Sequence, residues 1–400
     1  MTATPTISDD DLRQEVRKWL TQNWKGDLPQ SRPWTTTPEL RAWLSKVVDA
    51  RWAVNRWPVE WHGRGLSDAQ AKIVEQEFRA VRAPGAGQDK THMYAITALT
   101  FGTDALKLRL LRGMLAGEIT MCLLYSEPGA GSDLAGVRTR AERDGDDFAI
   151  NGQKVWTSGA MSADYGMLIA RTDWNAPKHQ GISFFFLPMK QKGVQVRPLR
   201  QVTDESHFNE VFFTDARVPE ENLLGGLNNG WRVLQTALAY ERSVMGEAAR
   251  GPRRSPGGAA NDLIALAREA GRLSDPVLRQ DLARVLGQRR VNALNSARAK
   301  SDLETGTSSS IMSLGKLAMS RILHEEARVR TALLGAGSLL DGEGFPRADD
   351  ANFLTLNAYF TSIGGGTDQI QRNIIGERVL GLPKEPEVDR DIPFRDVRAG

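Results

Sequence analysis

The organisation of this chain follows from the stretch Tyr125-Ser-Glu-Pro-Gly-Ala-Gly-Ser-Asp133, which leads through two runs of alternating polar and apolar residues to Lys154-Val-Trp-Thr-Ser158. Gly129 and Gly131 permit either a close approach of the backbone to a ligand or a positive φ. Ser132 adds a short polar group to the same tight loop. A loop of this composition is typical of an anion or phosphate contact.

The turn sequences Asp144-Gly145 and Asn151-Gly152 interrupt the alternating runs, and such residue pairs favour tight hairpin turns. Two hairpins would return Trp156 and Ser158 to the neighbourhood of the glycine-containing loop. A flat aromatic ring beside hydroxyl groups suits a planar cofactor. The Gly-Ala-Gly run by itself is more often an ordinary turn, and it does not open a strand-glycine-helix unit of the dinucleotide-binding type.

Length and composition are those of an ordinary soluble globular protein with two or three domains. The chain has 400 residues, of which 40% are apolar and 25% are charged. Its formal net charge of +3 is small for this length, and the basic residues are scattered among nearly as many acidic ones, so nucleic-acid binding is not indicated. Local basic sites remain available to an acidic ligand.

The single cysteine, Cys122, rules out an internal disulfide framework and favours a reducing compartment, with packing as the role of its thiol. The five histidines lie far apart with no paired ligand spacing, so no metal site is predicted. No apolar run approaches the roughly 18 residues that span a bilayer. A cytoplasmic protein without a membrane-spanning segment is therefore expected.

The hydrophobic period changes twice along the chain. Up to about residue 118, apolar residues recur at three- and four-residue spacing, as at Leu12, Val16 and Leu20, which indicates helices. From residue 119 to about 230 the period is two, and helical periodicity resumes at Trp231. An antiparallel sandwich or barrel is predicted from five short runs: Phe148–Ile150, Tyr165–Ala170, Gly181–Leu187, Val194–Val202 and Asn209–Phe213.

The helical C-terminal part has one interruption, Arg250-Gly-Pro-Arg-Arg-Ser-Pro-Gly-Gly-Ala-Ala260, which is basic and rich in proline and glycine. This composition predicts a mobile surface loop. Its basic residues either are simply solvated or contact a phosphate of a ligand or a partner subunit.

With Asn151-Gly-Gln-Lys154 and the Trp-Thr-Ser that follows, the central stretch resembles the signature of the acyl-CoA dehydrogenase family, flavoenzymes that desaturate acyl-CoA thioesters. The segment from Trp57 to Ser67 resembles the family's Trp-Pro-Glu-Tyr-Gly-Gly loop, although core packing is the preferred role of its tryptophans. The resemblance implies an N-terminal α-helical bundle over residues 1–118, a middle antiparallel β-domain over 119–230 and a C-terminal α-helical bundle over 231–400, with FAD at their junction.

The expected catalytic base is missing from its usual place. Such an enzyme needs a carboxylate to remove the α-proton, donors for the developing enolate oxygen, and an oriented flavin. In most of the family the base is a Glu directly before Gly-Thr, and the matching run here is Gly364-Gly-Gly-Thr-Asp-Gln-Ile-Gln-Arg372, with Gly365 at that position. Asp368 is not an obvious substitute, because it opens a helix, where Asp more often serves the N-terminal dipole.

The resemblance implies a second location for the base. A minority of the family carries it directly before an arginine after the β-domain, where this chain has Glu241-Arg242. Many relatives keep this pair as a structural feature, but the loss of the usual base favours Glu241. Glu247 is a weaker candidate, because it lies on a different face of the same helix. Gly365 keeps its backbone N–H as an oxyanion donor, and the vacated volume favours a bulky or branched acyl group.

The resemblance also implies contacts for the flavin and for the substrate. Those of the flavin are Tyr125 and Ser126 at the pyrimidine edge, Gly131 and Ser132 at the pyrophosphate, and Trp156 and Ser158 beside the isoalloxazine, with Ser158 placed for N5. Thr367 and Gln369 complete the cofactor pocket. The substrate contacts are Ser132, Arg242 and Gly366, although Arg242 could instead only pair with a carboxylate.

Two elements with which the family holds the adenosine half of a neighbour's FAD are reduced here. The Arg-x-x-Phe-Gly element is missing between Arg272 and Arg290, and Gln-x-x-Gly-Gly-x-Gly is reduced to Ala332-Leu-Leu-Gly335-Ala-Gly337. The chain looks most like the actinobacterial members that degrade steroid side chains as α2β2 heterotetramers. This implies a second acyl-CoA dehydrogenase-like subunit that completes the site, with a homotetramer as the alternative.

The predicted function is FAD-dependent α,β-desaturation of a bulky acyl-CoA, steroid or branched, with electrons passed to an electron-transfer flavoprotein. Two alternatives stay open. An acyl-CoA oxidase or flavin monooxygenase on the same fold would also lack the usual Glu, and oxygen consumption with hydrogen peroxide formation would reveal it. A non-catalytic subunit that supports a catalytic partner has no need to keep Trp156, Ser158, Thr367 and Glu241 together.

Overall fold

The structure is a computed structural model, and it describes residues 7–26, 28, 36–248, 259–304, 311–340, 342 and 344–398. Of the helical residues 241–248, 259–261, 300, 303–304 and 311–313, only the backbone is described. The chain forms two compact units. Unit 1 comprises Met1–Leu199, Ser206–Glu241 and Val388–Gly400, and unit 2 comprises Arg200–Glu205 and Arg242–Glu387.

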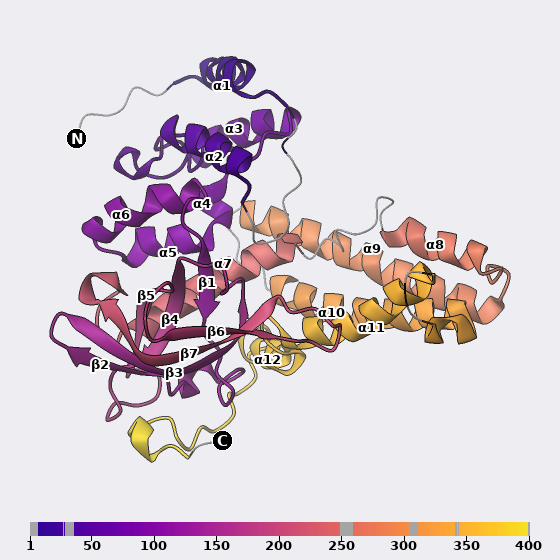
Figure 1. Ribbon diagram of the computed structural model, residues 1–400. Coiled ribbons are helices and arrows are strands. Elements are labelled where there is room, and N and C mark those ends of the chain that lie inside the picture. The colour runs from indigo at the N-terminus through magenta and orange to yellow at the C-terminus, as the bar shows by residue number, and fades with distance from the viewer. Residues whose placement is uncertain are drawn as a thin grey trace. The chain divides into compact units, whose positions relative to one another are not determined.

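Unit 1 begins with helices whose first residues are set by side-chain caps. Ser8, Thr37, Ser67 and Thr103 each accept a hydrogen bond from the backbone N–H three residues further on, which satisfies a donor that the helix itself leaves unpaired. The helices are α1 (Asp9–Asn23), α2 (Pro38–Asp49), α3 (Asp68–Ala80), α4 (Gln88–Thr91), α5 (Met93–Phe101), α6 (Asp104–Leu115) and α7 (Gly230–Ala248), the last of which continues into unit 2 (Figure 1).

Unit 1 also contains one eight-stranded sheet. Its strands are β1 (Met121–Leu124), β2 (Arg140–Asp144), β3 (Asp147–Ser158), β4 (Tyr165–Arg171), β5 (Ile182–Pro188), β6 (Val194–Leu199), β7 (Phe208–Pro219) and β8 (Leu223–Leu224). They lie in the order β6-β7-β3-β2-β4-β5-β8, with β1 beside β4. Neighbours are antiparallel, except that β1 and β2 each pair with β4 in parallel.

The burial of β4 and β5 on both faces shows how the sheet is covered. Because side chains alternate along a strand, Met167 and Phe184 face one way and join the core of the N-terminal helices. Leu168 and Phe185 face the other way and pack with Phe148 of β3. The sheet therefore curls so that two of its parts share a core, as the predicted sandwich or barrel requires, while helices close its outer face (Figure 1).

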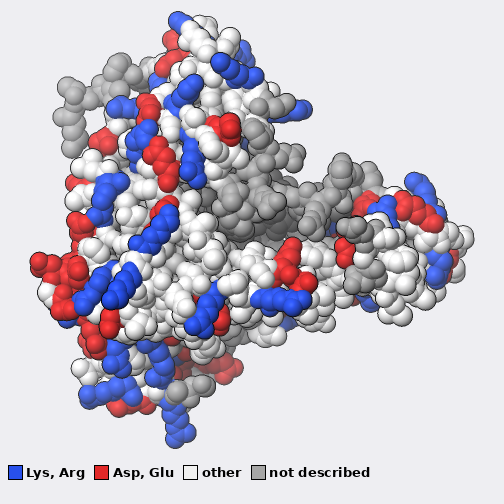
Figure 2. All heavy atoms as spheres, viewed as in Figure 1, with Lys and Arg blue, Asp and Glu red and all other residues white. Residues whose placement is uncertain are grey.

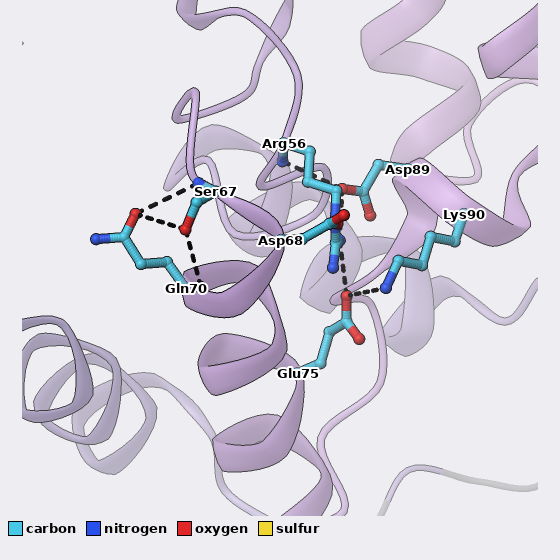
Figure 3. Close-up of polar contacts among 7 residues, drawn as sticks. All are labelled: Arg56, Ser67, Asp68, Gln70, Glu75, Asp89 and Lys90. Carbon is cyan, nitrogen blue, oxygen red and sulfur yellow. Dashed lines mark hydrogen bonds and ion pairs between the residues drawn. The ribbon is translucent and has the colours of Figure 1, made fainter. Parts of the chain in front are cut away.

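A network of charged side chains fixes the loop between α2 and α3 (Figure 3). Arg56 Nε lies 2.5 Å from Asp68 Oδ1, and Arg56 Nη1 lies 2.8 Å from Glu75 Oε1 and 2.9 Å from Asp89 Oδ2. Lys90 Nζ adds a contact of 3.5 Å to Glu75 Oε1. Burial alone would lower the pKa of Arg56, but the three carboxylates raise it, so the guanidinium is charged at neutral pH.

Unit 2 is helical, and α10 lies at its centre. Its helices are α8 (Ala259–Glu269), α9 (Pro276–Glu304), α10 (Ile311–Leu334), α11 (Pro346–Ile363) and α12 (Asp368–Ile374), which continues as a π-helical turn, Ile375–Val379. Apolar side chains such as Leu266, Leu282 and Val329 join α8, α9 and α10 in one buried cluster. α10 also packs against α11 and α12, which flank the triglycine loop, defined here as Gly364–Thr367.

The order helices, sheet, helices predicted from the sequence is confirmed. Cys122 is buried in the sheet, as its predicted packing role requires. The hairpin at Asp144-Gly145 is also confirmed, because β2 and β3 pair up to Asp144 and Asp147. The predicted loop at 250–260 lies, up to residue 258, outside the described residues.

The second predicted turn, Asn151-Gly152, is wrong, because both residues lie inside β3. Gly152 marks a shift of the β3–β7 register, and a Cβ there would lie 2.8 Å from the Cα of Thr139. The glycine therefore permits a close approach of two backbone segments inside a strand. The Asn151 side chain exchanges two hydrogen bonds of 2.9 Å and 3.0 Å with Asp215 on β7, which holds the strands together.

The surface carries charged side chains of both signs, as the composition indicates (Figure 2). Basic and acidic side chains are interspersed on the face that Figure 2 shows. None of the described helices is long and apolar enough to cross a membrane. Within the described ranges, no three side chains of His, Cys, Asp or Glu gather as a metal site.

Candidate active site and family

The cradle loop, defined here as Glu127–Asp133, begins with a turn closed by backbone hydrogen bonds. Glu127 and Ala130 each donate an N–H to the carbonyl oxygen of the other, both at 3.0 Å. Gly129 and Gly131 are not in the left-handed region, and a Cβ on either would meet open space. The sequence suggests two reasons for these glycines. A positive φ is excluded, and the remaining reason is that they leave room for a ligand against the backbone.

A buried ion pair ties the cradle loop to β3. Lys154 is fully buried, and its Nζ lies 2.8 Å from Glu127 Oε1 and 3.0 Å from the carbonyl oxygen of Tyr125. Glu127 also accepts hydrogen bonds from the backbone N–H groups of Arg138 and Thr139, at 2.7 Å and 2.8 Å. Burial alone would raise the pKa of Glu127, but Lys154 and these donors lower it. The carboxylate is therefore charged at neutral pH.

The aromatic side chain of Trp156 stands exposed beside the cradle loop. Val155 donates its N–H to the carbonyl oxygen of Ser126 at 2.9 Å, which brings this part of β3 to the start of the loop. Trp156 has a φ of 62°, rare for a bulky residue, and lies at a second register shift between β3 and β7. Its side chain is 58% exposed, and its ring meets Phe208 edge-on, with centroids 5.8 Å apart. An exposed ring held by an uncommon backbone conformation is typical of a functional contact.

A pocket of about 230 Å³ opens beside the turn that begins the cradle loop. It is lined by Glu127, Pro128, Gly129, Gly136, Arg138, Thr139, Gly152 and Gln153. None of the predicted flavin contacts lines it, so we do not assign the flavin ring to this pocket.

In unit 2, the triglycine loop joins the end of α11 to the start of α12. Gly365 and Gly366 both have left-handed backbone angles, with φ of 65° and 89°. Thr367 caps α12, because its Oγ1 accepts a hydrogen bond of 3.2 Å from the N–H of Ile370. Glycine at position 365 therefore meets a requirement of the backbone, besides lacking the carboxylate expected there.

A polar ladder on α10 fixes both ends of the triglycine loop. Lys316, Ser320 and His324 are spaced by four residues and so share one face of α10. Ser320 Oγ lies 2.8 Å from both Asp368 Oδ2 and Ser362 Oγ, Lys316 Nζ donates to Asp368 Oδ1 at 3.1 Å, and His324 Nε2 lies 2.7 Å from Ser362 Oγ. Ser362 precedes the loop and Asp368 follows it, so the ladder holds the loop between two points.

Comparison with known proteins identifies the family. The chain matches the sequence profiles of the acyl-CoA dehydrogenase N-terminal domain over residues 6–118, middle domain over residues 122–216 and C-terminal domain over residues 228–380. This chain belongs to the acyl-CoA dehydrogenase family. It is thus an oxidoreductase of the acyl-CoA dehydrogenase type, in a family that is flavin-dependent.

Several relatives match nearly the whole chain. Acyl-CoA dehydrogenase IpdE1 of Mycobacterium tuberculosis is 34% identical over 94% of this chain and 98% of its own length, and IpdE1 of Mycolicibacterium smegmatis is 36% identical over 95% and 99%. Among solved structures, the Tcur3481-Tcur3483 steroid ACAD superposes with a TM-score of 0.71 at 28% identity, covering 96% of this chain and 100% of that one. The ChsE4-ChsE5 complex of Mycobacterium tuberculosis superposes with a TM-score of 0.65 at 28% identity, and the match covers 96% of this chain and 100% of that one.

The structure brings one group of the predicted acyl-CoA dehydrogenase contacts together. Tyr125 and Ser126 lie next to Trp156 through the bonds to Lys154 and Val155, with Ser158 two residues further along β3. The Tyr125 side chain points into the core, where its ring meets Phe184, and its carbonyl oxygen accepts the hydrogen bond from Lys154. An exposed indole, neighbouring hydroxyls and open space beside the glycines are compatible with a flavin.

The other predicted contacts lie elsewhere. Gly365, Gly366, Thr367 and Gln369 belong to unit 2, on the triglycine loop and α12. Glu241 and Arg242 are consecutive residues of α7 at the boundary of the two units, and their side chains lie outside the described part of the structure. Their roles as base and substrate contact stay predictions.

Several residues that shape the site are not among those predicted from the sequence. Phe208 supports Trp156, and Lys154 with Glu127 fixes the cradle loop. The spacing of Lys316, Ser320 and His324 was a usable signal, because three polar residues at intervals of four mark one face of a helix.

Proposed function

We propose that this chain catalyses the FAD-dependent α,β-desaturation of a bulky acyl-CoA thioester, with a steroid side chain or a branched acyl group as the leading class. The observation that carries this proposal is Gly365. The chain keeps the family's Gly-Thr-x-Gln-Ile-Gln-Arg run but has a glycine of left-handed φ where the base is expected. The similarity to a structure described as a steroid ACAD supports the substrate class.

In this proposal, Glu241 removes the α-proton of the thioester, and the backbone N–H of Gly365 donates a hydrogen bond to the thioester oxygen as negative charge develops there. Because a glycine has no side chain, the space beside this N–H can take a branched or ring-bearing acyl group. Arg242, Gly366 and Ser132 are the proposed further contacts of the acyl-CoA.

FAD, when bound, supplies the acceptor for the hydride that leaves the β-carbon. The residues proposed to hold it are Tyr125, Ser126, Gly131, Ser132, Trp156, Ser158, Thr367 and Gln369. The exposed ring of Trp156 would orient the flavin, and Ser158 would donate to N5. An electron-transfer flavoprotein is the proposed acceptor for reoxidation, with the chain acting inside the cell.

We further propose an α2β2 heterotetramer in which a second acyl-CoA dehydrogenase-like subunit completes the FAD site. The reduced adenosine-binding elements of this chain support it, and so does the similarity to ChsE4-ChsE5, which is a complex of two chains. A homotetramer is the alternative.

The central test replaces Glu241 by Gln in the full-length protein, co-expressed with the proposed second subunit. Turnover should fall by about three orders of magnitude or more, because removal of the base stops α-proton abstraction. Flavin content and acyl-CoA affinity should stay within about twofold of wild type, since the substitution keeps the size of the side chain. Stopped-flow flavin reduction under anaerobic conditions measures the step directly. Near-normal reduction would exclude Glu241 as the base.

The same measurement on Glu247→Gln separates the two candidates, because only the true base should be indispensable. Glu introduced at Gly365 in the Glu241→Gln variant should restore part of the rate if both positions reach the α-carbon. The restoration should be incomplete, because a non-glycine residue in the left-handed region costs about 1–2 kcal/mol. Hydrogen peroxide formed in stoichiometric amount with oxygen consumed would identify an oxidase instead.

A further inference from the structure

The C-terminal strap, defined here as residues 388–398, returns to the sheet of unit 1 (Figure 1). Pro393 pairs with Pro177 in an isolated bridge. Phe394 donates its backbone N–H to the carbonyl oxygen of Ala176 at 3.0 Å, next to this bridge. The Phe394 side chain is completely buried, so the strap is anchored by a core residue and not merely laid on the surface.

The first link from the strap to the cradle loop runs through Arg171. This arginine is fully buried at the end of β4, with its guanidinium 3.6 Å from the centre of the Phe394 ring. It donates to the carbonyl oxygens of Ala135 at 2.6 Å and Val137 at 3.3 Å, which lie just after the cradle loop. Burial lowers the pKa of Arg171 to about 10, so it stays charged at neutral pH. The Phe394 ring thus covers a cation whose hydrogen bonds hold the backbone behind the loop.

A second link is ionic. Lys178 Nζ lies 3.3 Å from Asp133 Oδ2, the last residue of the cradle loop, and 3.3 Å from Asp389 Oδ2 on the strap. Burial alone would lower the pKa of Lys178, but the two carboxylates raise it. One ammonium group therefore joins the loop and the strap.

A third link involves Arg138. Its Nη2 donates to the carbonyl oxygen of Val397 at 3.1 Å. The backbone N–H of the same residue donates to Glu127, at the other end of the cradle loop. The segment from Asp133 to Arg138 is therefore held to the strap by three contacts, made by the Phe394 ring, by Asp389 and by the carbonyl oxygen of Val397.

We propose that the strap is a positioning element for the cofactor: it holds Asp133–Arg138 in place, so that Gly131 and Ser132 are presented to the FAD pyrophosphate before FAD binds. The inference rests on the proposed function in one respect, the binding of FAD by these two residues. An exposed, glycine-containing loop loses conformational freedom when it binds a ligand, whereas a loop that is already held loses less. The strap should therefore raise FAD affinity without touching FAD.

The test measures FAD binding in the full-length protein, co-expressed with the proposed second subunit and freed of flavin. Phe394→Ala removes the ring over Arg171, and Lys178→Met removes the ionic link at nearly constant size. Each should raise the Kd for FAD, followed by the quenching of flavin fluorescence, by about tenfold or more. Arg395→Ala is the matched control on the strap, because this side chain is 63% exposed. Its Kd should stay within twofold, and equal Kd values for wild type, Phe394→Ala and Lys178→Met would overturn the proposal.

A second measurement separates positioning from general stability. In the flavin-free protein, amide hydrogen exchange over residues 129–138 should quicken in both variants, while β4 and β5 keep their protection. Phe394→Leu should restore most of the affinity, because it keeps the apolar cover. If amide protection were lost over the whole sheet while the folded fraction kept the wild-type Kd for FAD, the strap would only stabilise the fold, and the proposal would be wrong.

These outcomes are distinct from failure of the proposed function. A wild-type protein that binds FAD but desaturates no acyl-CoA would refute the catalytic proposal and leave the strap test valid. A wild-type protein that binds no FAD would overturn both.

Discussion

At the scale of single residues, Lys154 shows what a buried charge requires. Its ammonium group lies between a carboxylate and a backbone carbonyl, with no exposed surface. Replacing Lys154 by Met should reduce the free energy of unfolding by about 3–5 kcal/mol, because Glu127 is then buried without its counter-ion. Urea denaturation at pH 7 measures this. The double variant that also carries Glu127→Gln should recover part of the lost free energy of unfolding. A double variant no more stable than Lys154→Met would contradict this coupling of the pair.

The same pair gives a pH dependence of defined sign. The pKa of Glu127 is lower in the folded protein than its unfolded value of about 4.3, so its contribution to stability is present above that pH. The contribution is lost as the pH falls through the lower, folded pKa. Lys154→Met should weaken this acid-dependent loss of stability, and denaturation curves between pH 7 and pH 3 for both proteins would check it.

Residue identity alone predicted the hairpin at Asp144-Gly145 correctly and the one at Asn151-Gly152 wrongly. Both pairs have the same local preference for a turn. What distinguishes them is tertiary: Asn151 finds Asp215 on β7, and Gly152 gives room to Thr139. The burial of Lys154 likewise depends on the register of β3, which no local pattern contains.

At the scale of elements, the ladder on α10 suggests how a loop of three glycines keeps one conformation. Ser320→Ala should reduce kcat/KM by about tenfold, because Ser362 and Asp368 lose their common partner and the triglycine loop loosens. Ser296→Ala on α9 is the matched control, since among the described residues its hydroxyl bonds only the carbonyl of Asn292 in its own helix, at 2.9 Å. Steady-state kinetics and thermal unfolding of both variants measure the effect. Equal kinetics for the two would exclude a positioning role of the ladder.

Elements with strong periodicity were predictable, and those set by partners were not. The helices from α1 to α3 repeat apolar residues at helical spacing, and each begins at a Ser or Thr cap. Strands β1 and β8 escaped prediction, because they are short and owe their place to β4 and β5. The strap has no periodic pattern, and its anchoring by Phe394 is visible only in the folded chain.

At the scale of the whole molecule, unit 2 carries apolar side chains that its own core does not bury. Val291 and Leu294 lie three residues apart on α9 and are 57% and 53% exposed. If α9 forms part of a subunit contact, Leu294→Glu should convert the assembly to smaller species, since a buried carboxylate without a partner opposes association. Leu108→Glu is the control, a leucine that is 73% exposed on α6 of unit 1. Light scattering coupled to size-exclusion chromatography measures both, and an unchanged mass for Leu294→Glu would exclude α9 from the contact.

The family and the order of its three parts could be recognised from the central motif, because its residues make contacts within a short segment. The division into two units could not, because it depends on which distant segments pack together. Residues 388–398 belong with the sheet, although the helical bundle of unit 2 precedes them in the chain.

This path of the chain has a mechanical consequence. Between residue 1 and residue 400 the backbone passes from one unit to the other four times, at residues 199, 205, 241 and 387. The chain thus enters unit 2 from unit 1 and returns to unit 1 afterwards. A single proteolytic cut between the two units therefore leaves them joined by the backbone at another of these four positions. Release of an intact unit 2 would require several cuts, and pulling on either terminus would load unit 1 before unit 2.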